Sequence, residues 1–187
     1  MGLMPKLIPS FKKGFTLIEL LIVISIIGIL AALTLASFGG AQAKARDGIR
    51  KSDLAQMKRA LELVKSDCSG SAYYPLSGAA GTGAAQYTNL GTYLTSFTPK
   101  YISSTPQDPT GNYGYLVSGT VVNKCPDTAG TLNVTGATDY AMYAILEQGA
   151  KDAQGTDSRT KCNGKPVPGS GTWTDATYAG YYVVCNN

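Results

Sequence analysis

The fold of this chain is decided by Lys12-Lys13-Gly14-Phe15-Thr16-Leu17-Ile18-Glu19-Leu20, the start of an almost unbroken apolar run that ends at Phe38. From Leu17 onward the run contains one strongly polar residue, Glu19, and no proline. Its 22 residues, at about 1.5 Å of rise each, make roughly 33 Å of helix, enough to cross a hydrocarbon core about 30 Å thick. We therefore predict a membrane-spanning helix.

Basic residues before the run predict its orientation. Lys6, Lys12 and Lys13 stay cytoplasmic under the positive-inside tendency, so the C-terminal bulk is expected outside. Two simpler interpretations remain open. A secretory signal peptide cut near residues 34–36 requires a shorter apolar core, of about 7 to 15 residues, without an acid. A plain single-pass anchor leaves Glu19 without a role, although a carboxylate at this depth is costly.

The leader ending in Gly14, the segment Phe15-Thr16-Leu17-Ile18-Glu19 and the apolar helix together resemble the N-termini of type IV pilins and type II secretion pseudopilins. The resemblance implies a leader peptide over residues 1–14, which a prepilin peptidase removes by cutting between Gly14 and Phe15 on the cytoplasmic face. It also implies methylation of the new amine of Phe15. Glu19 is then the fifth residue of the mature protein.

The position of Glu19 has a physical reason as well. Cleavage leaves a cationic amine on Phe15 at a helix N-terminus, where the macrodipole already adds positive charge. Glu19 lies four residues further on, about 6 Å of helical rise, so it can reach this amine or that of a neighbouring subunit. Removing one partner of such a desolvated pair is costly. We interpret Glu19, with Phe15, as a device for recruitment and register in assembly.

The helix is expected to continue to residue 65. Residues 15–38 form the part in the membrane or filament core, and residues 41–65 form an amphipathic part. The apolar stripe of the second part follows helical spacing and consists of Ile49, Leu54, Met57, Leu61 and Val64.

Gly39 and Gly40 lie between the two parts. Each glycine costs a helix about 1 kcal/mol relative to alanine. We expect a flexible or non-helical point here, which opens when the helix leaves the membrane.

Charged side chains cover much of the remaining surface of residues 41–65. They are interpreted as a solvated face; the alternatives are ion pairs between subunits or contact with lipid headgroups. Asp47 precedes Arg50 and Lys51 at the spacing of helical ion pairs.

Residues 66–187 are expected to form a globular α+β head. A loop over Cys68–Ala85 precedes a short helix over Asn89–Phe97. The polar segment Glu147–Thr177, with Trp173, is predicted to consist of loops. Three β-rich runs, the first folding back at Ser118-Gly119, are predicted as strands: Tyr113–Val122, Asp139–Leu146 and Tyr178–Val184. They form a small antiparallel sheet against the apolar stripe of the helix.

Two segments of the head resemble the pseudopilin branch of the family. Tyr73-Tyr74-Pro75 matches its Tyr-Pro after the long helix. The segment from Pro106 to Tyr113 resembles its PxDPxGNxY pattern, with one residue fewer before the tyrosine. The alternative interpretation of this segment is a rigid turn. These matches favour a major pseudopilin as the alternative function.

The four cysteines contain no CxxC pair, and the chain has no histidine, so a zinc site is not expected. On the external side of a membrane, disulfides are the expected state. Three connectivities are allowed. We favour Cys162 with Cys185, which ties the last strand to the preceding loop, and Cys68 with Cys125, which pins the helix end to the sheet.

The charge balance argues against nucleic acid as a partner. The formal net charge is +4, but without the leader 13 basic residues face 12 acidic ones, and from Ser66 onward six face eight. One local basic group, Arg159, Lys161 and Lys165, keeps a DNA-uptake pilin among the alternatives.

Catalysis and cofactors have little support in the sequence. Without histidine, Ser-His and Cys-His nucleophile pairs are excluded, and no P-loop or GxSxG motif occurs, so no enzyme activity is expected. Asp152 and Asp157 are interpreted as solvated loop charges. No cofactor is expected. A calcium ion, common in pseudopilins, has candidate ligands without an EF-hand spacing: Asp108, Asp127, Asp139 and Asp175.

These observations predict a structural subunit, a major pilin, of a type IV pilus or related extracellular filament. Its expected partners are copies of itself, the membrane, the prepilin peptidase and an assembly platform with an ATPase motor. The precursor is expected in the inner membrane and the product in a filament at the cell surface. The alternatives are a major pseudopilin, a DNA-uptake pilin and a soluble secreted protein.

Overall fold

The computed structural model describes residues 14–69, 74–75, 83–108, 110–127, 129 and 132–186. The leader predicted over residues 1–14 therefore lies, except for Gly14, outside the described residues. The chain divides into two compact units, residues up to Gln42 and Ala43–Asn187. The sequence suggested a boundary near residue 66. The second half of the long helix instead belongs with the head, because its buried side chains form part of the head's core.

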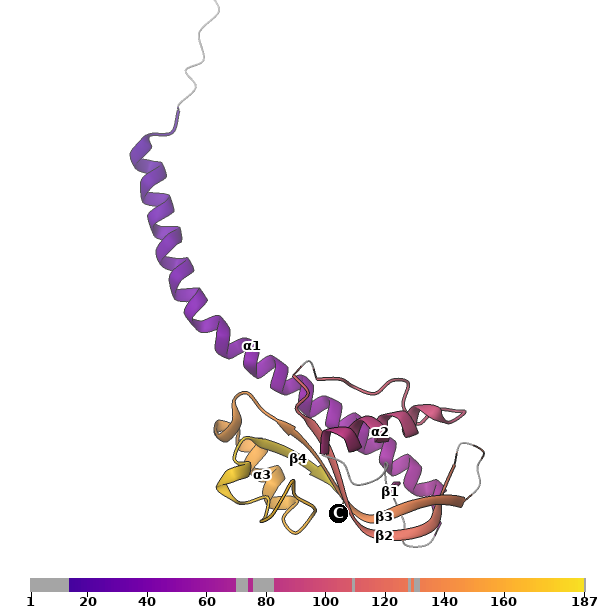
Figure 1. Cartoon of the computed structure of the whole chain (residues 1–187). Coiled ribbons are helices and arrows are strands. Elements are labelled where there is room, and N and C mark those ends of the chain that lie inside the picture. Colours follow the sequence, from indigo (N-terminus) through magenta and orange to yellow (C-terminus); the bar gives the residue numbers. More distant parts are fainter. Residues whose placement is uncertain are drawn as a thin grey trace, which may run out of the picture. The chain divides into compact units, whose positions relative to one another are not determined.

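The long helix α1 spans Leu17–Asp67, close to the predicted bounds (Figure 1). By length and composition it is able to cross a membrane. Its large apolar side chains from Leu17 to Phe38 are about half or more exposed in the single chain. Gly39 and Gly40 both lie inside α1, so the subunit has no non-helical break at this pair. Flexibility there in a filament stays a prediction.

The head is built around one antiparallel sheet, as predicted, and the fold class is α+β. The strands are β1 Tyr74–Pro75, β2 Tyr113–Pro126, β3 Leu132–Ile145 and β4 Tyr181–Cys185. The strand β3 pairs with β2 along one edge and with β1 and β4 along the other. Helix α2, Gly83–Ser96, begins six residues before the predicted start.

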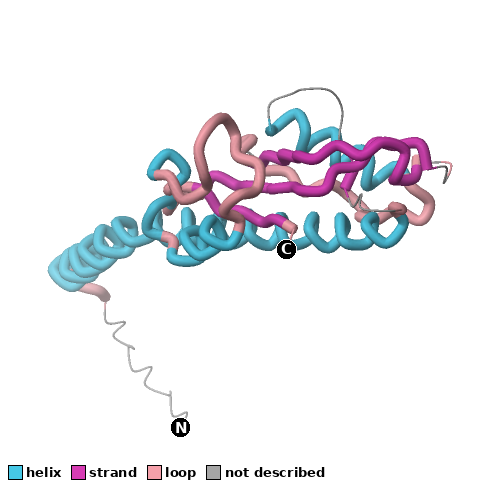
Figure 2. The backbone as a smooth tube through the Cα atoms, turned by 90° about the horizontal axis from the view of Figure 1, so that it is seen from below, coloured by secondary structure: helices cyan, strands magenta, loops and turns pink. Residues whose placement is uncertain are grey.

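The two faces of the sheet bury different cores, because side chains alternate along a strand. Tyr140 and Met142 of β3 face a core shared with the buried side of α1 and with α2. Figure 2 shows this half of α1 running beside the strands. The predicted stripe of α1 is buried at Leu54, Met57, Leu61 and Val64. Ile49 is 60% exposed, so its assignment to the stripe was wrong.

The opposite face of the sheet buries Ala141, Val183, the disulfide of Cys162 with Cys185, and Trp173. The indole of Trp173 is fully buried, with ring centroids of Tyr178 and Tyr143 at 5.2 and 5.9 Å. Trp173 is therefore a core residue of an otherwise irregular segment.

The prediction that Glu147–Thr177 consists of loops was wrong in part. This segment contains helix α3, Ala153–Lys161, and a short 3-10 helix, η1, Gly149–Lys151; a second 3-10 helix, η2 Ala176–Tyr178, follows at its end. Asp152 caps α3 by accepting a hydrogen bond from the Gly155 amide at 2.9 Å. Ser158 accepts one from the Val183 amide at 3.0 Å. Cap and strand contacts therefore stabilise a helix that lacks an apolar stripe.

The predicted hairpin at Ser118-Gly119 was also wrong. The strand β2 continues through this point to Pro126. Its register with β3 is unbroken across Gly119, with Ser118 opposite Asp139 and Thr120 opposite Ala137, and it shifts only beyond Val121. Gly119 has φ +70°, and a Cβ there would lie 1.9 Å from the Thr138 hydroxyl oxygen. Glycine is therefore required here because β2 adopts a positive φ and its backbone lies close to Thr138 of β3. The presence of a glycine in the sequence does not by itself distinguish such a position from a turn.

We predict that Gly119→Ala destabilises the head more than Gly111→Ala. Both glycines have φ +70°, which costs a residue with a Cβ about 1–2 kcal/mol, but a Cβ at Gly111 meets nothing within 4 Å. Urea denaturation of the full chain in detergent, followed by far-UV circular dichroism, measures the difference. Equal losses from the two variants would show that the contact with Thr138 is unimportant.

Candidate assembly site

The N-terminus of α1 holds Glu19 in a hydrogen-bonded ring with Thr16. One oxygen of the Glu19 carboxylate accepts hydrogen bonds from the backbone N–H of Thr16 at 2.8 Å and from its hydroxyl at 2.7 Å. The Thr16 hydroxyl oxygen in turn accepts from the backbone N–H of Glu19 at 3.2 Å. This is a capping box, which satisfies two N–H groups that a helix start leaves without partners.

The capping box places the carboxylate over the positive end of the helix dipole, next to the predicted cleavage point. The Phe15 side chain just before it is 88% exposed. Thr16 was missed from the sequence as a functional residue, although the spacing Thr-x-x-Glu is a readable signal for it. Glu19 is therefore already oriented by its own chain toward the N-terminal end of α1.

A buried ion cluster around Arg50 holds the head on the second half of α1. The Arg50 guanidinium donates to Asp47 at 2.8 Å and to Asp108 at 3.2 Å, and it lies 2.9 Å from Glu147. The side chains of Arg50, Asp47 and Asp108 are only 2–3% exposed. Arg46 forms a bidentate pair with Glu147, in which its guanidinium donates one hydrogen bond to each carboxylate oxygen. The interpretation of this charged stretch as a solvated face was therefore wrong for Arg50 and Asp47.

The cluster joins three segments that are distant in the sequence. Asp47 also accepts the backbone N–H groups of Glu147 and Gln148, both at 2.9 Å. Asp108 accepts bonds from the Thr110 hydroxyl and the Asn112 amide, which close the predicted turn. Pro109, in the middle of that turn, lies outside the described residues. The part of α1 that contains Asp47 and Arg50 is thus tied to the turn before β2 and to the end of β3.

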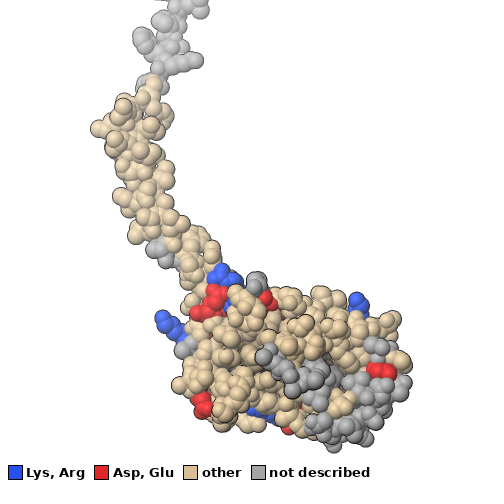
Figure 3. Space-filling model, viewed as in Figure 1, with Lys and Arg blue, Asp and Glu red and all other residues tan. Residues whose placement is uncertain are grey.

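Electrostatic partners in the cluster change the ionisation of its members. Hydrogen bonds from Arg46 hold the pKa of Glu147 at about 2, well below its ordinary value. Burial by itself would raise the pKa of Asp108, but hydrogen bonds from Thr110 and Arg50 outweigh it and lower that pKa. On the face drawn in Figure 3, basic and acidic side chains meet in one group at an edge of the head, while others are scattered.

Two disulfides link the elements of the head, in the pairing favoured from the sequence. Cys68 follows α1 and is joined to Cys125 of β2, while Cys162, at the end of α3, is joined to Cys185 of β4. The closed loops span sequence separations of 57 and 23 residues, so each bond contributes roughly 3–4 kcal/mol in the chain-entropy model.

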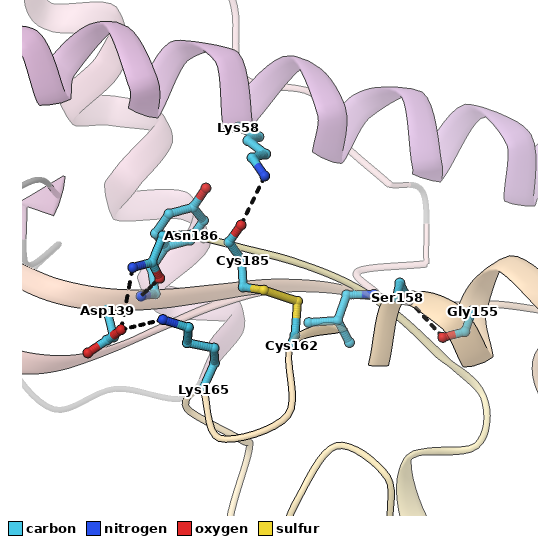
Figure 4. The surroundings of a disulfide bond; sticks show 10 residues. Lys58, Asp139, Gly155, Ser158, Cys162, Lys165, Cys185 and Asn186 are labelled. Atoms are coloured by element: carbon cyan, nitrogen blue, oxygen red, sulfur yellow. Dashed lines mark hydrogen bonds and ion pairs between the residues drawn. A yellow bond between two sulfur atoms is a disulfide. The ribbon is translucent and has the colours of Figure 1, made fainter. Parts of the chain in front are cut away.

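The surroundings of the second disulfide fasten the last strand on both sides (Figure 4). Lys58 of α1 donates to the Cys185 carbonyl at 3.0 Å. The side-chain amide of Asn186 accepts from the Tyr140 N–H and donates to the Thr138 carbonyl, at 3.0 and 3.1 Å. It thus continues the pairing of β3 beyond the end of β4.

Charged residues singled out in the last third of the chain have structural partners. Asp152 caps α3 and pairs with Lys51, so only Asp157, which pairs with Lys161, matches the expected exposed charge. Arg159 is buried and donates to the carbonyls of Ala179 and Tyr181. The predicted basic group of Arg159, Lys161 and Lys165 is therefore not a free cationic surface, because Lys165 also pairs with Asp139.

The candidate calcium ligands are likewise distributed among other contacts. Asp108 binds Arg50, Asp139 binds Lys165, Asp175 accepts from the Thr172 amide, and Asp127 from the Ala129 amide. Within the described ranges, no three His, Cys, Asp or Glu side chains gather as a metal site would require.

Comparison with known proteins points to one family. The model described as the prokaryotic N-terminal methylation motif matches residues 10–35. A fimbrial protein of Dichelobacter nodosus is 40% identical over 74 residues, which are 38% of this chain and 46% of that protein. The chain thus spans about half the length of such relatives. The type II secretion system core protein G of Escherichia coli K12 is 32% identical over 108 residues, 57% of this chain and 72% of that protein.

The chain belongs to the type IV pilin and type II secretion pseudopilin family. Another relative, the type IV major fimbrial protein FimA of Dichelobacter nodosus strain VCS1703A, is 35% identical over 109 residues, 54% of this chain and 64% of that protein. No solved structure matches the chain significantly. In this pilin-family chain the matched motif covers Phe15, Thr16 and Glu19, the residues of the capping box and of the predicted cleavage point.

We predict that Arg50→Met strongly destabilises the head. The substitution leaves the buried carboxylates of Asp47 and Asp108 without their cation, which typically costs about 3–5 kcal/mol. Arg59→Met is the matched control, because Arg59 is exposed and takes part in none of the ion pairs among the described residues; its effect should stay within about 0.5 kcal/mol. Denaturation of the detergent-solubilised full chain measures both. Similar stabilities of the two variants would contradict a structural role for the cluster.

The lowered pKa values predict a loss of stability in acid. A carboxyl group whose pKa is depressed by folding stabilises the fold above its unfolded pKa, and this contribution disappears as the pH falls through the folded value. For Glu147 this window runs from its ordinary value of 4.5 down to about 2. We expect the urea midpoint to fall across that range and Glu147→Gln to flatten the fall. An unchanged pH profile in Glu147→Gln would exclude the ion pair as a cause.

Proposed function

We propose that this chain is a structural subunit, a major pilin, of a type IV pilus or a closely related filament. The observation that carries this proposal is the exposure of the apolar side chains in the first half of α1 in the single chain. The same half begins with Glu19, whose carboxylate caps the helix. Such a surface needs lipid before assembly and other copies of the helix afterwards. The names of the relatives, fimbrial proteins and a secretion-system core protein, support a structural rather than a catalytic role.

In the proposed pathway, the membrane holds the precursor with its leader in the cytoplasm and its head outside. Prepilin peptidase cleaves between Gly14 and Phe15 and methylates the new amine. An assembly platform driven by an ATPase then extracts the subunit from the membrane. The apolar half of each α1 exchanges its contacts with lipid for contacts with the same helix of neighbouring subunits. The glycine pair Gly39 and Gly40 is the point where α1 would bend or open during this transfer.

Glu19 sets the register in this proposal. One of its oxygens is engaged by Thr16, which fixes the direction of the carboxylate. The new amine forms one residue before Thr16, so the amine of an incoming or neighbouring subunit would meet an oriented carboxylate. In an apolar filament core the pair excludes other axial positions, because any shifted position leaves a buried charge without a partner.

A major pseudopilin of a type II secretion system is the second candidate. The alignment with core protein G covers 72% of that relative, a larger share than for the first fimbrial protein. The Asp108 turn, which the Arg50 cluster holds, belongs to the segment that resembles pseudopilins. Filaments longer than the cell envelope favour the pilin; secretion of a folded exoprotein that depends on this chain favours the pseudopilin.

We predict that Glu19→Ala leaves membrane insertion and cleavage intact but abolishes or severely reduces filament yield. The variant removes the charge that selects the register, while the apolar run becomes more favourable in lipid. Thr16→Val is the companion variant, since it loses the capping hydroxyl but keeps the carboxylate, and it should assemble with lower yield. Membrane fractionation, N-terminal sequencing and the amount of sheared filament give the three readouts. Normal yield from Glu19→Ala would refute the role in register.

A further inference from the structure

A hollow of about 560 Å³ lies where α1 enters the head, between α1 and the segment from Gln148 to Gln154. Lysines from both sides line it: Lys44 and Lys51 from α1, and Lys151 from η1. Gly48 lies on the α1 side, and a Cβ built on it meets nothing within 4 Å. The hollow is therefore open to a small polar group.

Two of the lysines that line the hollow form no ion pair among the described residues. Lys44 and Lys151 are exposed, and neither forms an ion pair with any carboxylate in the described part of the chain. Lys51 binds Asp152 and, at 3.0 Å, Gln154. The other acid of the lining, Asp47, is engaged by Arg50 and by two backbone N–H groups. Two lysines without a carboxylate partner among the described residues thus line the hollow, while both of its carboxylates are neutralised.

The position of the hollow along the helix indicates its partner. Lys44 follows Phe38, the end of the apolar run, by six residues, which is about 9 Å of rise in α1. The hydrocarbon core of a bilayer is about 30 Å thick and the headgroup layers extend the total to about 40–45 Å. Each headgroup layer is thus about 5–7.5 Å thick, and the backbone of Lys44 lies just beyond it. Side chains of a helix lean toward its N-terminus, so the long Lys44 side chain can reach back into the headgroup layer.

We propose that this hollow binds the phosphate of an anionic lipid headgroup through Lys44 and Lys151. This inference rests on the proposed function, because it requires the apolar half of α1 to span a membrane before assembly. The bound headgroup holds the base of the head at the membrane surface, and extraction into a filament removes it. The hollow is large enough to admit a phosphate, and the negative charge of the phosphate complements the two ammonium groups, which act as point charges on flexible stems.

The test uses the full-length precursor in nanodiscs of phosphatidylcholine, with or without phosphatidylglycerol, and measures the acetylation rate of each lysine by mass spectrometry. Each lysine near an anionic surface strengthens binding about fivefold, so phosphatidylglycerol should slow Lys44 and Lys151 by about that factor or more. Lys65 and Lys100, on other parts of the head, are internal controls whose rates should not change. Salt at about 1 M, where the Debye length is about 3 Å, should remove the protection.

A charge placed in the hollow gives the decisive comparison. Gly48→Glu should abolish the protection of Lys44 and Lys151, whereas Gly48→Gln, of the same size, should retain it. Protection by inorganic phosphate in pure phosphatidylcholine discs, equal slowing of all four lysines, equal loss in both Gly48 variants, or no protection at all would each overturn the lipid site. Failure of the precursor to insert into discs would instead contradict the proposed function.

Discussion

The apolar surface of α1 between Leu17 and Phe38 is the constraint on which everything else in this chain depends. These side chains are exposed in the isolated subunit, and burying each large one is worth about 1.5–3 kcal/mol. The segment therefore cannot remain in water, and only lipid or other apolar helices satisfy it. A subunit that exchanges lipid for other helices needs a group that sets its position and a head that stays folded. The helix-capping carboxylate of Glu19 at the start of the segment and the stable, nearly neutral head after its end fit these two needs.

The head has to withstand that exchange, and it is fastened to α1 by three kinds of interaction. The main core buries one side of the second half of this helix, at Leu54, Met57, Leu61 and Val64. The Arg50 cluster ties the start of this half to the turn before β2 and to the end of β3. The disulfide of Cys68 ties its end to β2. The opposite face of the sheet has its own core around Trp173, closed by the second disulfide. The second half of α1 is thus tied to the head near its start, in its middle and at its end.

The sequence predicted what depends on local pattern. The apolar run, the α+β class and the approximate positions of β2, β3 and β4 follow from periodicity and residue type. It did not predict that Arg50 is buried, because its partners Asp108 and Glu147 lie far along the chain and such pairings leave no periodic signal. Helix α3 was missed because a cap and contacts with β4 stabilise it rather than an apolar stripe. Thr16 was missed although the capping-box spacing was visible.

We propose that the apolar half of α1 is finally buried against copies of itself in an extracellular filament. Electron microscopy of producing cells, with gold-labelled antibodies against the head, tests it most directly. Filaments should extend from the cell surface and carry label along their whole length, since every subunit is this chain. Label confined to the soluble medium, on protein that starts at Ser37 after removal of the apolar run, would contradict it.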